Sequence, residues 1–364
     1  MSRTFSQSAP GLTAEFRRQA PSGPEQPYLL MISLDAAGRE ELRAQLAPAI
    51  ARARSSASPL EAQFLAREAA RPVARDVFGD CLLAAAREHL AGGGVIIWHG
   101  LPICDARASD AESDALTFGQ ALTAVIAQGT TQSFGYVQED SGRHFQRLYP
   151  VAGLTHCGKT PDALLPHLDN AMLVPAAQPE VIHLVCVNND AQAATNFLSV
   201  GAVLLGLREG FEARLVDRLF EPAYVTALSN SFVADASAKA ITTRARPILY
   251  RRLGEGPATR FLGKGYDMHV APGMENGVEY EQALAAYQQV LKERRDLAYS
   301  ITPLPGQAVS FHQQRLLHGR GPIAAGKHRE MVRSYGRFDF SELMARIGHV
   351  PADYIFDGIQ LVDR

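Results

Sequence analysis

The chain has 364 residues, of which 46% are hydrophobic and 20% charged, and its formal net charge is −2. These values are typical of a globular protein with a substantial core, and they exclude a largely disordered chain. The near balance of charge excludes a broad positive surface, so we expect a small-molecule ligand and neither nucleic acid nor a membrane as partner.

The N-terminal 27 residues are rich in Ser, Pro, Gly and Gln and contain no apolar stretch of the kind found in signal peptides. We therefore expect a flexible arm over residues 1–27 and a single domain over 28–364. No apolar run reaches the length of a membrane span. The four cysteines form no CxxC pair, which argues against a zinc ribbon or a disulfide scaffold. These features favour a cytoplasmic protein.

Helical and extended patterns alternate irregularly through the first half of the chain. Residues 28–34 predict a short strand, and helical periodicity follows over 35–55 and roughly 59–91. Residues 92–103 predict a glycine turn and a buried strand; because no GxGxxG or GK[ST] pattern follows, a phosphate-binding loop is disfavoured. The next predicted elements are a helix over 113–128 and strands over 133–138, 180–190 and 194–200.

The second half is dominated by short strands. Helices are predicted over 201–220 and 278–300, and strands over 248–253, over 259–265, and in "GQAVSFHQ", "LLHGRGPI" and "REMVRSYGRFD". Many short strands separated by turn residues and interrupted by a few helices indicate a β-sandwich or jelly roll with flanking helices. A doubly wound parallel sheet would need a more regular alternation of strands and helices.

The stretch "LLPHLDNAML" places His167 and Asp169 two residues apart, a spacing that points both side chains to one side of an extended strand. With 11 histidines and 38 acidic residues in the chain, about one His-x-Asp/Glu sequence is expected by chance. Two occur, the second being His328 and Glu330. The pair alone therefore does not distinguish a metal site from a hydrogen-bonded surface pair.

The order of three motifs is more informative: "PHLDNA", then "RLLHGRGP" with His318, then the arginine-rich "KHREMVRSYGR". Two histidines and a carboxylate form the facial triad of non-haem Fe(II) oxygenases, which leaves three positions for a 2-oxo acid and dioxygen. If His328 and Glu330 were the metal ligands instead, Arg329 between them would have no anionic ligand to bind.

From about residue 90 to 340 the motifs, in order, resemble the Fe(II)/2-oxoglutarate-dependent dioxygenases of the taurine dioxygenase type, particularly their clavaminate synthase-like branch. The resemblance implies a double-stranded β-helix, or jelly roll, of mixed α+β and mainly β class, with flanking helices. It implies that His167, Asp169 and His318 bind Fe(II), and that O2 and 2-oxoglutarate are cosubstrates.

The same resemblance implies three further ligands. Arg329, eleven residues after His318, would grip the distal carboxylate of 2-oxoglutarate in a bidentate manner that lysine cannot reproduce. Thr195 would hydrogen-bond the cosubstrate. Arg333 would bind the cosubstrate or a carboxylate of the substrate.

For function, the resemblance implies hydroxylation of an unactivated C–H bond in an arginine-, lysine- or asparagine-like amino acid or a derived small molecule, in natural product biosynthesis, with release of succinate and CO2. Gln138 would contact the amino-acid backbone of the substrate. Asp267 stands where relatives with basic substrates place carboxylates. Halogenating relatives lack the carboxylate ligand, so Asp169 favours hydroxylation.

The chain departs from the branch in three places. Asp169 replaces a common Glu, the interval from His318 to Arg329 is closer to the taurine dioxygenases, and "FHQQR" stands where an Asn is common. Two alternatives therefore stay open: a jelly-roll protein that binds a metal or small molecule without redox chemistry, and a hydroxylase of a peptide- or carrier-bound residue.

Overall fold

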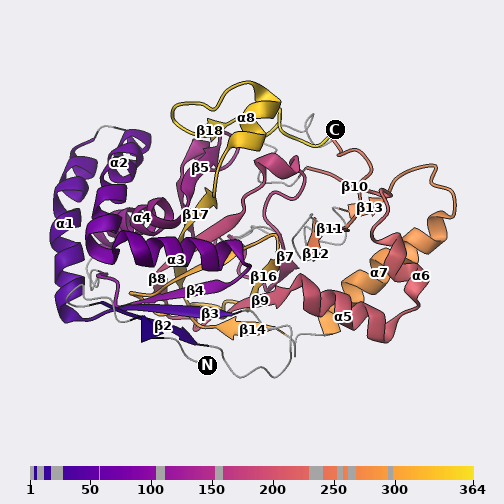
Figure 1. The fold of residues 1–364 in the computed structure, drawn as a ribbon, viewed down its shortest axis with the longest axis horizontal. Coiled ribbons are helices and arrows are strands. Elements are labelled where there is room, and N and C mark those ends of the chain that lie inside the picture. Colours follow the sequence, from indigo (N-terminus) through magenta and orange to yellow (C-terminus); the bar gives the residue numbers. More distant parts are fainter. Residues whose placement is uncertain are drawn as a thin grey trace.

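The structure is a computed structural model and describes residues 4–5, 12–17, 28–56, 58–103, 111–151, 159–228, 241–251, 257–260, 268–293 and 298–364. Two β-sheets face each other in the middle of the molecule, with one group of helices beside each sheet (Figure 1). No helix in these ranges is both long and apolar enough to cross a membrane.

The larger sheet has ten strands in the order β1-β2-β3-β4-β15-β8-β17-β5-β18, and β6 also pairs with β17. Its central strands β15, β8 and β17 are antiparallel, whereas β3 pairs with β4 and β18 with β5 in parallel. The strands are β1 (Thr4–Phe5), β2 (Leu12–Arg17), β3 (Leu29–Leu34), β4 (Val95–His99), β5 (Gln132–Tyr136), β6 (Phe145–Leu148), β8 (Val181–Asn189), β15 (Ala308–His312), β17 (Arg329–Arg337) and β18 (Ile355–Phe356).

The smaller sheet has four antiparallel strands in the order β14-β9-β16-β7. They are β14 (Tyr299–Ile301), β9 (Thr195–Ser199), β16 (Leu316–Arg320) and β7 (Leu164–His167). Two further pairs lie beyond it, formed by β10 (Tyr224–Thr226) with β13 (Met268–Val270) and by β11 (Leu249–Arg251) with β12 (Pro257–Thr259).

The helices fall into two groups that lie on opposite sides of the sheets (Figure 1). The first comprises α1 (Ala36–Ser55), α2 (Pro59–Phe78), α3 (Asp80–Ala91) and α4 (Ala111–Thr130). The second comprises α5 (Val200–Gly210), α6 (Ala213–Arg218) and α7 (Gly277–Glu293), while α8 (Ser341–Ile347) precedes the C-terminus. Two short 3-10 turns, Asp140–Gly142 and Pro175–Ala177, complete the elements.

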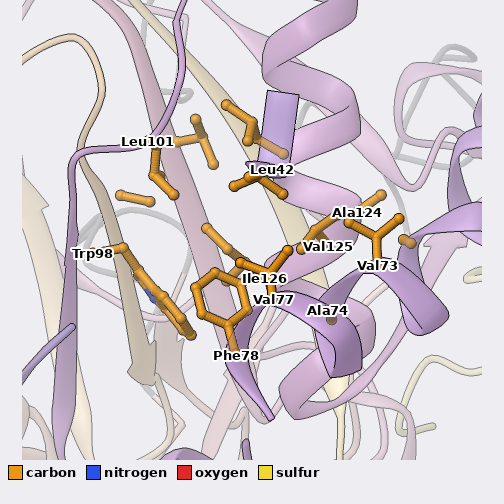
Figure 2. Close-up of a cluster of buried hydrophobic side chains, with 14 of the residues drawn as sticks. Leu42, Val73, Ala74, Val77, Phe78, Trp98, Leu101, Ala124, Val125 and Ile126 are labelled. Atoms are coloured by element: carbon orange, nitrogen blue, oxygen red, sulfur yellow. The ribbon is translucent and has the colours of Figure 1, made fainter. Parts of the chain in front are cut away.

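Three apolar clusters correspond to these layers, because successive residues of a strand point to opposite faces. Leu316 of β16 packs between the two sheets, whereas the next residue, Leu317, packs against α5 and α7. The third cluster lies between the first group of helices, α1, α2, α3 and α4, and the outer face of the larger sheet. There the rings of Phe78 and Trp98 meet edge to face with centroids 5.3 Å apart (Figure 2).

Several predicted elements differ in extent from those observed. The helical block predicted over 59–91 is two helices, because Gly79 adopts φ 75° between α2 and α3, a conformation that favours glycine. The strand predicted over 259–265 corresponds only to the end of β12, and residues 261–267 lie outside the described ranges. Of the predicted N-terminal arm, Thr4–Phe5 and Leu12–Arg17 form strands at the edge of the larger sheet.

A fully hydrogen-bonded histidine lies on the helix-facing side of the larger sheet. Thr131 donates its hydroxyl proton to the carbonyl of Ala127, so its Oγ1 accepts a bond of 3.1 Å from Nε2–H of His183. Nδ1 of His183 then accepts from Ser310, whose Oγ also accepts from the indole of Trp98. Burial lowers the pKa of His183 to about 3, so this imidazole is neutral in the folded protein.

The C-terminal tail is fixed by one buried carboxylate. Asp363 is 1% exposed and pairs with three arginines from the segment around β11 and β12. The distances are 2.9 Å to Arg244, 3.1 Å to Arg260 and 3.6 Å to Arg246. Burial, followed by the nearby Arg260, lowers the pKa of Arg246 to about 10. The tail therefore carries the only acidic partner that these guanidinium groups have within the described residues.

Candidate metal centre

Neighbouring strands of the smaller sheet bring His167, Asp169 and His318 together. His167 ends β7 and lies directly opposite His318 of β16, with ring centroids 4.5 Å apart. Oδ1 of Asp169 lies 3.5 Å from Nε2 of His167 and 3.9 Å from Nε2 of His318. One ligand atom from each residue lies within 4.8 Å of the other two, and no other group of three such residues is found in the part of the chain described above.

The competing pair from the sequence has different partners. Nε2 of His328 lies 3.4 Å from Oε2 of Glu330, and the same carboxylate is bound by Arg147. Within the described ranges this pair gains no third metal donor.

The tautomer of His167 directs a lone pair at this centre. Its Nδ1 lies 2.7 Å from the carbonyl of Leu165, which can only accept, so Nδ1 carries the proton and Nε2 is free to bind a metal. Burial, with His167 close by, lowers the pKa of His318 to about 3. The His318 imidazole is therefore neutral, as a metal ligand must be.

The carboxylate of Asp169 is held by its other oxygen. Oδ2 accepts a bond of 2.7 Å from Nη1 of Arg333 and a longer one of 3.3 Å from the hydroxyl of Tyr335. Burial alone would raise the pKa of Asp169, but Arg333 and the two imidazoles outweigh it and hold that pKa well below its usual range. Two imidazoles and an ionised carboxylate form a donor set that fits Fe(II).

A buried guanidinium lies across from the metal donors, on the other sheet. Nη2 of Arg329, in β17, donates a bond of 3.1 Å to Oγ1 of Thr195 in β9. Arg329 is 6% exposed, its Nε has no hydrogen-bond partner, and it has no carboxylate partner among the described residues. Burial, followed by repulsion from Arg320, lowers its pKa to about 10. A buried cation without a counter-ion fits an anionic ligand.

Of the three residues predicted to contact cosubstrate or substrate, Arg333 and Gln138 are hydrogen-bonded to other protein groups, and the third lies outside the described residues. Arg333 is engaged by Asp169 and by Gln146, its cross-strand neighbour, so its predicted contact with cosubstrate or substrate stays a prediction. The amide of Gln138 donates to Asp357 at 2.7 Å and accepts from the backbone of Gly358 at 2.8 Å. Asp267 lies outside the described residues.

The residue next to Gln138 is closer to the centre and was not singled out from the sequence. Glu139 is 7% exposed; its Oε2 lies 3.6 Å from Arg333 and accepts from Asn170 at 3.3 Å. Burial raises its pKa. A carboxylate between a strand and a tight turn is usually solvated, so nothing in the local pattern distinguished Glu139. Gln146 was recognisable only through its register with Arg333.

Comparisons with known proteins give a family match and several similar solved structures. The family model described as taurine catabolism dioxygenase TauD, TfdA family matches residues 61–335. No curated protein matches the chain by sequence.

Among solved structures, the chain is similar to asparagine oxygenase in complex with Fe(II), 2S,3S-3-hydroxyasparagine and succinate. The TM-score is 0.68 at 20% identity, covering 90% of this chain and 99% of that chain. It is also similar to the non-haem iron oxygenase OrfP in complex with Fe, succinate and (3S)-hydroxy-L-Arg, with a TM-score of 0.67 at 16% identity and coverage of 90% and 99%. At these identities the likeness supports the jelly-roll fold.

Proposed function

The chain belongs to the TauD/TfdA family of Fe(II)- and 2-oxoglutarate-dependent dioxygenases, and we propose that it hydroxylates an unactivated C–H bond of an amino acid or a small molecule derived from one. One observation carries the proposal: a three-donor site faces a buried guanidinium that has no carboxylate partner among the described residues. A protein that only bound a metal would need the first feature and not the second.

In this proposal His167, Asp169 and His318 bind Fe(II) through the three atoms that converge between them. Arg329 grips the distal carboxylate of 2-oxoglutarate, which removes the cost of its uncompensated buried charge. Thr195 accepts from Arg329, so its own hydroxyl proton is available to the same carboxylate.

Bound iron supplies the redox chemistry of the family, in which oxidation of 2-oxoglutarate to succinate and CO2 is coupled to hydroxylation of the substrate by dioxygen. The chain contributes position and environment. Arg333 and Tyr335 fix Asp169 through Oδ2, so that Oδ1 stays directed at the imidazoles. Phe311, fully buried between the sheets, packs on the His318 ring with centroids 5.0 Å apart and keeps water from that side.

The charges around Arg333 favour a substrate with an amine. Two buried carboxylates, Asp169 and Glu139, share this one guanidinium, and Glu139 has the weaker contact, at 3.6 Å against 2.7 Å. A substrate ammonium near Glu139 would complete its pairing. We propose that the substrate is a basic or amide amino acid, with Gln138 and Asp267 as further contacts. The complexes of asparagine oxygenase and OrfP with hydroxylated amino acids are the precedent for this class.

A succinate-release screen tests the proposal. Purified protein with Fe(II), 2-oxoglutarate and ascorbate is offered each common amino acid, succinate is quantified, and the amino acid is examined by mass spectrometry for added oxygen. We expect strong stimulation by one basic or amide amino acid, and none with the Asp169→Ala variant. Equal, weak turnover with every amino acid would contradict this substrate class.

Two alternatives give different results in the same screen. Intact iron binding without any succinate would favour a binding protein without redox chemistry. Succinate release only with an aminoacyl-peptide or a carrier-bound amino acid would favour a tethered substrate. We also propose a cytoplasmic location and a role in natural product biosynthesis; Cys81 and Cys186, both free thiols, are in keeping with a reducing compartment.

A further inference from the structure

The backbone of Asp169 is bound by a side chain from a distant part of the sequence. The N–H of Asp169 donates to Oε1 of Gln313 at 2.9 Å. Nε2 of Gln313 donates to the carbonyl of Asp169 at 3.2 Å and to the carbonyl of Pro179 at 2.8 Å. We infer that Gln313 is a positioning residue that fixes Asp169 relative to His318. The inference rests on the iron site proposed above.

The need for such a residue follows from where the strand ends. β7 stops at His167, and Asn170 adopts φ 57°, so Asp169 lies at the point where the chain leaves the sheet. Buried peptide groups that leave a ladder need other hydrogen-bond partners. The amide of Gln313 supplies a donor and an acceptor to one residue, as a neighbouring strand would. Its orientation is unambiguous, because the flipped amide would oppose oxygen to oxygen.

The location of Gln313 couples two metal donors. It lies in the turn between β15 and β16, is 1% exposed, and precedes His318 by five residues. The connection from β15 of the larger sheet to β16 of the smaller sheet therefore holds the backbone of the carboxylate ligand and leads directly into the strand that carries a histidine ligand. The separation of these two donors is therefore restrained through the short segment from Gln313 to His318, whereas Arg333 and Tyr335 of β17 restrain the Asp169 side chain independently.

The neighbouring residue is a matched control. Gln314 is also 1% exposed and lies in the same turn, and its amide donates to Pro179 at 3.4 Å, with no contact to Asp169. Substitution of Gln314 removes a buried glutamine and a hydrogen bond from the same turn. Only substitution of Gln313 removes the bonds to the metal-binding residue.

The test measures metal binding without turnover. Mn(II) is titrated into the full-length protein and its Kd determined by electron paramagnetic resonance, and the visible spectrum of the Co(II)-loaded protein is recorded. We expect Gln313→Ala to weaken Mn(II) binding about 10–100-fold and to change the Co(II) spectrum. Gln314→Ala should stay within about threefold of the parent protein and keep its spectrum, because no bond to Asp169 is lost.

Gln313→Met covers the case in which the alanine variant fails to fold, since Met fills a similar volume without either hydrogen bond; we expect it to lose the same affinity. Equal losses in the Gln313 and Gln314 variants, or parental affinity in a folded Gln313 variant, would overturn the inference and leave the proposed function standing. Failure of the parent protein to bind Mn(II) or Fe(II) would instead remove the proposed function, and the inference with it.

Discussion

Arg333 donates a hydrogen bond of 2.7 Å to Oδ2 of Asp169, while Oδ1 of the same carboxylate lies 3.5 Å from His167. The two oxygens therefore have separate tasks. One is occupied by a guanidinium from the larger sheet, and the other is available to a metal on the smaller sheet. Arg333 also contacts Gln146 and Glu139, so the planar guanidinium that binds the Asp169 carboxylate is itself held in place by several partners.

Arg333→Lys is expected to weaken Mn(II) binding about tenfold, because an ammonium keeps the charge but cannot span these partners. Isothermal titration of the metal checks this. Arg337→Lys is the control: Arg337 is a buried arginine of the same strand that binds Glu180 and backbone carbonyls away from the centre. If both variants bound Mn(II) like the parent protein, Arg333 would have no part in orienting Asp169.

Arg329→Met is expected to make the cosubstrate-free protein more stable while it abolishes binding of 2-oxoglutarate. Removing a buried charge that has no counter-ion should raise the free energy of unfolding of the cosubstrate-free protein, by about 1 kcal/mol or more. In the parent protein, 2-oxoglutarate at a hundred times its Kd should add about 2.7 kcal/mol, and the variant should lose this gain. Urea unfolding with and without 2-oxoglutarate measures both effects. A variant that is less stable alone and still stabilised by 2-oxoglutarate would contradict this assignment.

Thr195→Val tests how much the Thr195 hydroxyl, which accepts a hydrogen bond from Arg329, contributes to binding of 2-oxoglutarate. The substitution keeps the β-branched shape but leaves Nη2 of Arg329 without this acceptor. We expect KM for 2-oxoglutarate to rise about tenfold, in line with a loss of about 1.5 kcal/mol for a hydrogen bond to a charged group. Steady-state kinetics at saturating substrate provide the measurement, with Thr195→Ser as the variant that restores the bond. An unchanged KM in the valine variant would argue against Thr195 as a cosubstrate contact.

Acidification should destabilise the fold through His183. Its folded pKa, about 3, lies below the usual value of 6.5, so the unfolded chain binds a proton that the folded protein does not. Its contribution is complete above pH 6.5 and is lost progressively as the pH falls from there toward 3. Between pH 7.5 and 5.5 this amounts to about 1.4 kcal/mol.

Urea unfolding at both pH values, on the parent protein and on His183→Gln, measures this contribution. The variant should be less stable at pH 7.5 but lose less stability on acidification. His349→Gln, at an exposed position, should retain the parental pH dependence. A parental pH dependence in the His183 variant would mean that this imidazole is not the group responsible.

Asp363→Asn should cost about 3–5 kcal/mol, because it leaves the buried Arg246 and the largely buried Arg260 without an acidic partner among the residues that the structure describes. The loss should appear in the urea midpoint. Asp217→Asn, at an exposed position, should change stability by less than about 0.5 kcal/mol. A similar small effect at Asp363 would show that these arginines are compensated elsewhere.

The sequence was sufficient for the features that depend on local pattern. The sequence pattern predicted the strand around His318, and the ordered motifs, through the family resemblance, predicted that His167, Asp169 and His318 meet. It was insufficient where a feature depends on which strands become neighbours. Gln146 lies beside Arg333 only because β6 pairs with β17 in a particular register.

Two kinds of error have a physical cause. The helical block over 59–91 was predicted as continuous because apolar periodicity carries on through Gly79, although the backbone there leaves helical geometry. Glu139 was not singled out because the resemblance pointed to Gln138, and the pattern near a turn does not say which neighbouring residue lies inside. Gln313 lies in the "FHQQR" stretch that was noted only as a departure from the branch, and its role was not predictable because its partner is the backbone of Asp169.

The placement of Arg329 and the metal donors on different sheets has a mechanical consequence. A molecule that coordinates the ion and also meets Arg329 is a non-covalent cross-link between the two layers, at a place where the direct contact is the Arg329 to Thr195 bond. Occupancy should then slow the separation of the layers, and amide exchange in β9 and β17 should slow together, although the two strands share no backbone ladder.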